Sequence, residues 1–207
     1  MEANETRSGS GYRLRRAALD DASAVAEIWR AGWLDGHAGN VPEGLVRHRQ
    51  DINDYVPRAR DRIDTMWVAA SHEGRVLGFV VVKDDELEQV YVDRSARGSG
   101  VAAALLRQGE DEVRRAGHTR AWLAVVAGNA RARAFYARQG WRDAGPFIYH
   151  AETAEGSSAV APPLIPRAPR RAADAQAPPA PAAGRRRSRC RGSSLPTPRP
   201  PSSSARG

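Results

Sequence analysis

LEQVYVDRSARGSGVAAALLRQGEDEVRRA, residues 87–116, joins a short β-branched run to a glycine-rich turn that opens directly into an amphipathic helix. Val90, Tyr91 and Val92 are typical of the end of a buried strand. The turn is residues 97–100, and apolar residues then recur at helical spacing. The first turn of a helix has backbone N–H groups without intrahelical partners, and glycine lets a ligand approach the backbone closely. This junction of strand, glycine-rich turn and helix therefore predicts a site for a phosphate-bearing anion.

One known pattern in this turn is the dinucleotide-binding motif G-x-G-x-x-A, satisfied by Gly98, Gly100 and Ala103. A dinucleotide fold places its glycines directly after the strand and an acidic residue at the end of the next strand. Here residues 93–96 intervene, and the next apolar run ends in residues 126–128, Val-Ala-Gly. This context disfavours a dinucleotide site. A further interpretation is that the glycines serve only to form a tight turn.

A second signature is NARARAFYARQGW, residues 129–141. Asn129 stands at a helix N-cap position, apolar residues follow at helical spacing, and Gly140 ends the helix. An apolar run, residues 121–127, precedes it and predicts a buried strand parallel to the strand before it.

Together the two motifs resemble those of the GCN5-related N-acetyltransferases (GNATs). Arg97, Gly100 and Ala102 fit that family's R-x-x-G-x-A pyrophosphate loop, and residues 129–141 fit its N-x-x-A-x-x-F-Y-x-x-x-G-aromatic signature. The resemblance covers about residues 12–152. It implies a mixed α/β fold, with a mostly antiparallel central sheet, a parallel and splayed pair of strands, and flanking helices.

Other elements follow from periodicity and turn residues. We expect a strand at residues 12–16, a helix from Leu19, a second helix from Pro42 to about Arg60, and a β-hairpin of residues 66–70 and 76–82.

The resemblance implies acetyl-CoA as cosubstrate and no metal. The residues expected to hold the pantetheine arm through backbone groups are Val90, Tyr91 and Val92. Those expected to hold the pyrophosphate through their amides are Arg97, Gly98, Ser99, Gly100, Val101 and Ala102. Asn129 is expected either to contact the cofactor or simply to cap its helix.

Acetyl transfer to an amine needs a neutral nucleophile and a proton for the departing thiolate. The family's tyrosine at this position lies near the coenzyme sulfur, so the resemblance makes Tyr136 the general acid; packing with a satisfied hydroxyl is the alternative. Glu88, which alternates with Val90 along the strand, is the expected base. It could equally be a solvated strand residue or an ion-pair partner, and Glu86 and His37 are further candidates. An amine that arrives partly deprotonated would need no dedicated base.

The expected function is transfer of an acetyl group from acetyl-CoA to a primary amine of a small molecule or protein, by direct attack in a ternary complex. The resemblance implies an acceptor pocket opposite the cofactor, lined by the first two helices, their connection and the last hairpin. Trp33, His37 and Tyr55 are candidates by location. Neither the identity of the acceptor nor homodimer formation is decided by the sequence.

Composition divides the 207 residues near Ser157. From there on, ten arginines against one acid give +9, eleven of the fourteen prolines occur, and there is no aromatic residue. The preceding residues carry −1 in total. A segment of such composition buries too little apolar surface to fold. We expect a flexible N-terminus at 1–10, an acetyltransferase domain at 11–156 and a disordered tail at 157–207.

Prolines after Ser157 oppose the last strand of the family's fold, so we expect that strand to be missing or reduced to a stub around residues 159–161. Either a shift of the reading frame near Ser157 or a natural extension of the protein would account for the tail. Two alternative functions follow: acetyl-CoA binding without efficient turnover, and weak, non-specific nucleic-acid association through Arg185–Arg191.

The only cysteine, Cys190, excludes an intramolecular disulfide. The first eleven residues lack the apolar core of a signal peptide, and no run approaches the roughly twenty apolar residues of a membrane span. We expect a soluble, cytoplasmic protein without a membrane partner.

Overall fold

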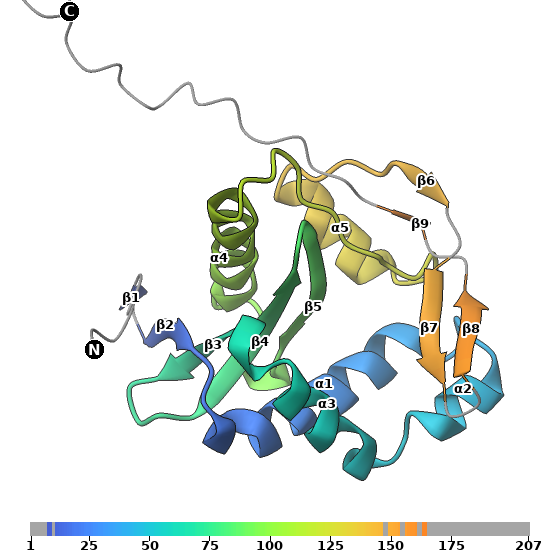
Figure 1. Ribbon diagram of the computed structural model, residues 1–207, viewed down its shortest axis with the longest axis horizontal. Coiled ribbons are helices and arrows are strands. Elements are labelled where there is room, and N and C mark those ends of the chain that lie inside the picture. Colours follow the sequence, from blue (N-terminus) through green and yellow to red (C-terminus); the bar gives the residue numbers. More distant parts are fainter. Residues whose placement is uncertain (1–7, 10, 147–148, 154–155, 161–162, 165–207) are drawn as a thin grey trace, which may run out of the picture. The chain divides into compact units, whose positions relative to one another are not determined.

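The computed structural model describes residues 8–9, 11–146, 149–153, 156–160 and 163–164. Its centre is an antiparallel sheet flanked by helices (Figure 1). In sheet order, the strands are β1 (Ser8–Gly9), β2 (Tyr12–Arg16), β3 (Met66–Ser71), β4 (Val76–Lys83) and β5 (Glu86–Val92). The expected first strand and hairpin are thus confirmed.

Helices cover both faces of this sheet. On one face lie α1 (Ala22–His37) and α3 (Tyr55–Asp61), which bury Trp29, Tyr55 and Phe79 in a common apolar cluster. On the other face lies α4 (Val101–Arg115), whose Leu105 and Leu106 are fully buried. The β-branched strand residues point alternately into the two clusters because successive side chains of a strand point to opposite faces.

The second expected helix is divided into α2 (Glu43–His48) and α3, so the prediction of one helix from Pro42 to Arg60 is wrong. Between them, the Asp51 carboxylate accepts a hydrogen bond of 2.9 Å from the backbone N–H of Asn53. Such a local bond offers the backbone an alternative to the continuing helix and starts a new turn.

A β-bulge interrupts β5 at Glu88. Gln89 pairs with Val81 whereas Leu87 pairs with Val82, so Glu88 is the additional residue. Leu87 and Val90 both pack on the α4 side as a result. Glu88 instead bonds to Arg62, next to α3. Because the bulge shifts the alternation by one residue, Glu88 and Val90 lie on different faces of the sheet.

The chain after α4 runs parallel to β5 only briefly. Trp122 forms a parallel bridge with Glu86, in which Leu87 N–H donates to the Trp122 carbonyl at 2.8 Å. Among the described residues, the two segments make no further bridge beyond this point. Of the expected parallel strand over residues 121–127, the structure contains this parallel bridge to β5 but no regular strand, and the opening lies between β5 and residues 123–126.

The remaining elements follow Asn129. They are α5 (Ala130–Arg138), β6 (Gly145–Pro146), β7 (Tyr149–Thr153), β8 (Gly156–Val160) and β9 (Pro163–Leu164). β7 pairs with β8 and β6 with β9, each as a two-stranded sheet of its own.

The expectation that the partner of β7 is missing or a stub is corrected by β8, whose five residues GSSAV contain no proline and pair fully. Pairing also extends past the expected boundary at Ser157. The rest of the predicted tail, residues 165–207 with Cys190 and Arg185–Arg191, lies outside the described residues, as does most of the predicted flexible N-terminus. Within the described ranges, no helix has the length and apolar character needed to cross a membrane.

Candidate active site

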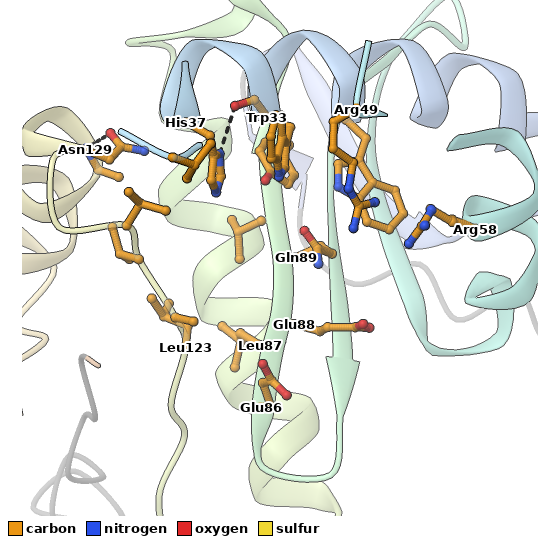
Figure 2. A pocket seen from close by; sticks show the side chains of 18 of the residues that line it. Trp33, His37, Arg49, Arg58, Glu86, Leu87, Glu88, Gln89, Leu123 and Asn129 are labelled. Carbon is orange, nitrogen blue, oxygen red and sulfur yellow. Dashed lines mark hydrogen bonds between the residues drawn. The ribbon is translucent and has the colours of Figure 1, made fainter. Parts of the chain in front are cut away.

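The divergence of β5 from residues 123–126 leaves a cavity of about 310 Å³. Glu86, Leu87, Glu88 and Gln89 follow one another along β5, and Leu123 faces them across the gap (Figure 2). Helices α1 and α3 and the segment between them supply another wall, which includes Trp33, His37, Arg49 and Arg58. This volume is within the usual range for small-molecule sites, roughly 300–1,000 Å³.

The turn at residues 97–100 is exposed and open. Gly98 and Gly100 have φ angles of +83° and +89°, and a Cβ on Gly98 would meet no atom within 4 Å. Within the part of the chain that the structure describes, five backbone amides here have no hydrogen-bond acceptor: Gly98, Gly100, Val101, Ala102 and Ala103. Donors of this kind at a helix N-terminus form an anion site.

Two of the amides expected to bind the pyrophosphate are already engaged. Arg97 N–H donates to the Arg94 carbonyl and Ser99 N–H to the Ala96 carbonyl, both at 3.3 Å. The contribution of Arg97 thus falls to its side chain, which donates to Asp35 at 2.6 Å. Arg94 pairs with the same carboxylate, and hydrogen bonding to Arg94 is the largest cause that lowers the Asp35 pKa to about 2. Arg97 is therefore held beside the turn by an anion.

The edge of β5 next to the turn is available to an extended ligand. Val90, Tyr91 and Val92 pair with β4 on one side. On the other side, the described residues provide no strand that pairs with them. The backbone edge at 90–92 and the open turn at 97–100 are consecutive along the chain, as a cofactor with a pantetheine arm and a diphosphate requires.

Tyr136, on α5, lines the cavity and is 7% exposed. Its ring packs against Phe135 and Trp141 at centroid distances of 5.2 and 5.8 Å. Burial raises the pKa of its hydroxyl. Among the described residues this hydroxyl has no hydrogen-bond partner.

Two carboxylates stand at the start of β5. Glu88 is bound by Arg62, whose Nη2 lies 2.9 Å from Oε1. Glu86 has no such partner within the described part of the chain, and burial, followed by the charge of Glu88, raises its carboxyl pKa to about 7. The two carboxylates are thus in different electrostatic settings within one cavity.

His37 and Tyr55, expected at the acceptor side by location, are both tied to the backbone. His37 Nδ1 lies 2.8 Å from the Trp33 carbonyl, and burial lowers its pKa, so the ring is neutral with Nδ1 as the donor. The Tyr55 hydroxyl donates to the Arg49 carbonyl at 3.1 Å, and burial raises its pKa to about 12. Of these two residues and Trp33, the structure brings His37 and Trp33 to the cavity.

Asn129 caps α5, because its Oδ1 accepts from Ala132 N–H at 3.1 Å. The same residue lines the cavity, and its Nδ2 lies against α1, where a Cβ on Gly36 would come within 2.6 Å. Capping is therefore established, and the amide nitrogen is left for other contacts. Among the described residues, no three His, Cys, Asp or Glu side chains gather so that they could hold a metal ion.

Comparison with known proteins agrees with this geometry. Residues 12–141 match the model of the acetyltransferase (GNAT) family. The chain belongs to the GNAT family. Its matched region runs from β2 to the end of the α5 signature, so both motifs lie inside it.

Curated relatives resemble parts of the chain. A mycothiol acetyltransferase of Clavibacter sepedonicus is 34% identical over 149 residues, which are 68% of this chain and 48% of that protein. An uncharacterized N-acetyltransferase of Mycobacterium tuberculosis is 34% identical over 80 residues, 36% of this chain and 51% of that protein. The chain thus spans about half the length of these two GNAT relatives.

Solved structures show the same GNAT fold. A GCN5-related N-acetyltransferase from Rhodopseudomonas palustris superimposes with a TM-score of 0.63 at 19% identity, covering 79% of this chain and 99% of that chain. A phosphinothricin acetyltransferase from Sinorhizobium meliloti, solved in complex with acetyl-CoA, gives 0.56 at 18% identity, covering 76% and 88%.

The sequence did not reveal the arginines of this GNAT cavity. Arg49, Arg58 and Arg62 come from a segment with many charges, which by pattern alone resembles a solvated helical face. Only their position in the fold distinguishes them from exposed neighbours such as Arg60.

Proposed function

We propose that this chain transfers an acetyl group from acetyl-CoA to a primary amine of a small molecule or protein, by direct attack in a ternary complex. The observation that carries the proposal is the continuity of three features. An open turn of unpartnered amides heads α4, an unpaired edge of β5 leads from it, and a cavity containing Tyr136 lies beside that edge. The names of the curated relatives and the acetyl-CoA in the Sinorhizobium meliloti structure support the same activity.

The residues present fit this cosubstrate. The backbone of Val90, Tyr91 and Val92 would pair with the pantetheine amides, and the amides of Gly98, Gly100, Val101 and Ala102 would hold the diphosphate with the Arg97 side chain. Ser99 shapes the turn through the bond from its hydroxyl to the Ala96 carbonyl, 2.6 Å. Asn129 would contribute its Nδ2. When bound, acetyl-CoA supplies the activated acetyl group.

Tyr136 is proposed as the group that holds the proton for the departing thiolate. Its raised pKa keeps the hydroxyl protonated at neutral pH. The same apolar surroundings raise the pKa of a thiol placed beside it, so the two groups stay matched well enough for proton transfer.

For the base we propose Glu88, which the bulge in β5 turns toward α3. Glu86 is the second candidate, because a carboxyl with a pKa of about 7 can accept a proton near neutral pH. His37 is neutral, and its Nε2 is also able to accept a proton.

A thiol-release assay with acetyl-CoA and a panel of amines tests this proposal, together with calorimetric titration of acetyl-CoA. We expect binding at one site and release of CoA that depends on the amine. Binding without release from any amine would instead favour the non-catalytic alternative, although the missing strand on which that alternative was based is present as β8. The proposed nucleic-acid association of Arg185–Arg191 lies outside the described residues.

A further inference from the structure

Arg94 precedes the GNAT turn motif, which begins at Arg97, and has no role in the function proposed above. It opens a short 3₁₀ turn, η4 (Arg94–Ala96), that connects β5 to residues 97–100. Side chains three residues apart lie on the same side of a 3₁₀ helix, so those of Arg94 and Arg97 can reach one partner. That partner is Asp35, in the last turn of α1.

The Asp35 carboxylate is shared unequally between the two arginines. Arg94 binds both of its oxygens, with Nε 3.0 Å from Oδ2 and Nη2 bonded to Oδ1. Arg97 contacts only Oδ2, through Nη2 at 2.6 Å. A guanidinium that holds both oxygens of a carboxylate forms the stronger, bidentate pair. Arg94 is therefore the main counter-charge of Asp35.

The Arg97 guanidinium consequently keeps most of its bonding capacity. Among the described residues it makes the single hydrogen bond to Asp35, whereas a guanidinium has several N–H donors in a planar fork. The Arg97 side chain is 32% exposed, so a ligand at the turn can reach the other donors. Asp35 thus orients Arg97 without using up its donors.

Asp35 reaches the turn from a helix that is packed tightly against the proposed cofactor site. A Cβ on Gly32 would lie 2.4 Å from Cδ1 of Tyr91, and a Cβ on Gly36 would lie 2.6 Å from Nδ2 of Asn129. Such close packing leaves α1 little room to move relative to β5. The Asp35 carboxylate is therefore a fixed charge beside the turn, and its effect there depends on the cation that neutralises it.

The ion pairs beside the turn contain one cation more than they contain anions. Asp35 pairs with Arg94 and Arg97, and Asp93, which precedes η4, pairs with Arg75 at 3.8 Å. Two carboxylates thus face three guanidinium groups. Without Arg94 this surplus would disappear, and Arg97 would be the counter-charge of Asp35. A diphosphate would then meet an arginine that is already neutralised.

We propose that Arg94 is a positioning residue of the acetyl-CoA site: it neutralises Asp35, so that Asp35 orients Arg97 while the charge of Arg97 is left for the diphosphate. This inference rests on the proposed function, because it concerns the diphosphate turn of that site. Arg94 acts through Asp35 and Arg97 and does not contact the ligand. Its loss has two effects of the same sign, since it removes a positive charge and lets Asp35 compete with the diphosphate for Arg97.

The experiment is calorimetric titration of CoA and of dephospho-CoA into wild-type protein, Arg94→Gln and the double variant Arg94→Gln/Asp35→Asn. Dephospho-CoA lacks the 3′-phosphate and keeps the diphosphate, so it distinguishes a direct contact with the 3′-phosphate from a role at the diphosphate. The matched control is Arg114→Gln. Arg114 is an exposed arginine in the last turn of α4 that also pairs with an aspartate, Asp111. The control removes the same charge at the opposite end of the helix from the turn.

We expect Arg94→Gln to bind both ligands about five- to tenfold more weakly than wild-type protein, because one unit charge is lost within a Debye length of the diphosphate. Arg114→Gln should bind both ligands as wild-type protein does. The double variant has the same net charge beside the turn as wild-type protein, so its affinity should return to within about threefold of the wild-type value. A merely structural role of Arg94 would not give this recovery, because the second substitution removes a further ionic contact.

Three results would overturn the inference and leave the acetyltransferase function standing. They are equal affinities in Arg94→Gln and Arg114→Gln, a double variant that binds as weakly as Arg94→Gln, and a loss in Arg94→Gln that is confined to CoA. The last result would mean that Arg94 binds the 3′-phosphate directly. If wild-type protein binds neither ligand, the proposed function fails, and the role of Arg94 fails with it.

Discussion

Arg62, at the C-terminal end of α3, binds both carboxylate oxygens of Glu88 in β5. Its Nε lies 3.1 Å from Oε1 and 3.0 Å from Oε2, and its Nη2 lies 2.9 Å from Oε1. Both side chains are largely buried, and the guanidinium also lies over the Trp29 ring, 5.6 Å from its centroid. The pair joins the helical layer to the β-bulge, so it fixes the position of the proposed base.

Glu88→Gln should therefore lower stability as well as activity. The substitution leaves Arg62 facing a neutral amide in a largely buried position, which costs about 1–3 kcal/mol. Urea unfolding measures this loss, and Glu27→Gln, at an exposed position of α1, provides the control with no expected change. Unaltered stability in Glu88→Gln would show that the pair is not formed in solution. Unaltered kcat would remove Glu88 from the mechanism.

Tyr136→Phe should lower kcat without lowering stability. The hydroxyl has no partner among the described residues, so its removal should not break a structural bond. Loss of a general acid typically slows a reaction by about a hundredfold or more. Thiol-release kinetics and thermal unfolding of the same samples measure the two effects. A large fall in stability with unchanged kcat would mean that the residue is structural.

Glu86→Gln should stabilise the protein more at high pH than at low pH. The folded-state pKa of Glu86 is about 7, above its usual 4.5, so the folded chain binds this proton more tightly than the unfolded chain does. Stability contributed by the protonated carboxyl is present at low pH and is lost as the pH rises toward about 7. The variant lacks this titration. The difference in melting temperature, variant minus wild type, should therefore increase by a few degrees from about pH 5 to pH 8. A difference that does not change with pH would contradict the burial of Glu86.

Gly32→Ala tests the packing of α1 on β5. A Cβ at Gly32 would lie 2.4 Å from Cδ1 of Tyr91, too close for any real contact. The ring must shift, and we expect a loss of about 1–3 kcal/mol together with weaker acetyl-CoA binding, since Tyr91 belongs to the proposed pantetheine edge. Gly44→Ala is the control, because Gly44 also lies in a helix but its Cβ would meet no atom. Equal stability and equal acetyl-CoA binding in the two variants would contradict this packing.

Much of the fold could be predicted from the sequence because its strongest signals are local. The turn at residues 97–100, the Asn129 cap and the hairpin of β3 and β4 each have a characteristic short pattern, and the structure contains all three. The division of the second helix was missed, since it depends on one hydrogen bond that the Asp51 carboxylate accepts from the backbone N–H of Asn53. The strand β8 was missed because nearby prolines dominated the composition.

The site was predictable only where it consists of backbone. The open turn follows from its glycines, but the bulge at Glu88 has no signal in a run of ordinary strand residues. The ion pair between Glu88 and Arg62 joins positions 26 residues apart, so no local pattern reports it. The same holds for Arg49 and Arg58, which only the packing of the helices on β5 brings to the cavity.

Calorimetric titration of acetyl-CoA into Gly98→Ala and Gly74→Ala tests the central claim most directly. Both glycines have left-handed φ angles, +83° and +89°, and neither Cβ would meet an atom within 4 Å, so the two variants carry a similar backbone strain of about 1–2 kcal/mol. Gly74 lies in the turn between β3 and β4 and is not among the residues proposed to hold the cofactor. We predict that wild-type protein and Gly74→Ala bind acetyl-CoA alike, and that Gly98→Ala binds it at least about tenfold more weakly because its methyl group blocks the approach of the diphosphate. Equal affinity in the two variants, or no binding by wild-type protein, would contradict the assignment of this turn as the acetyl-CoA site.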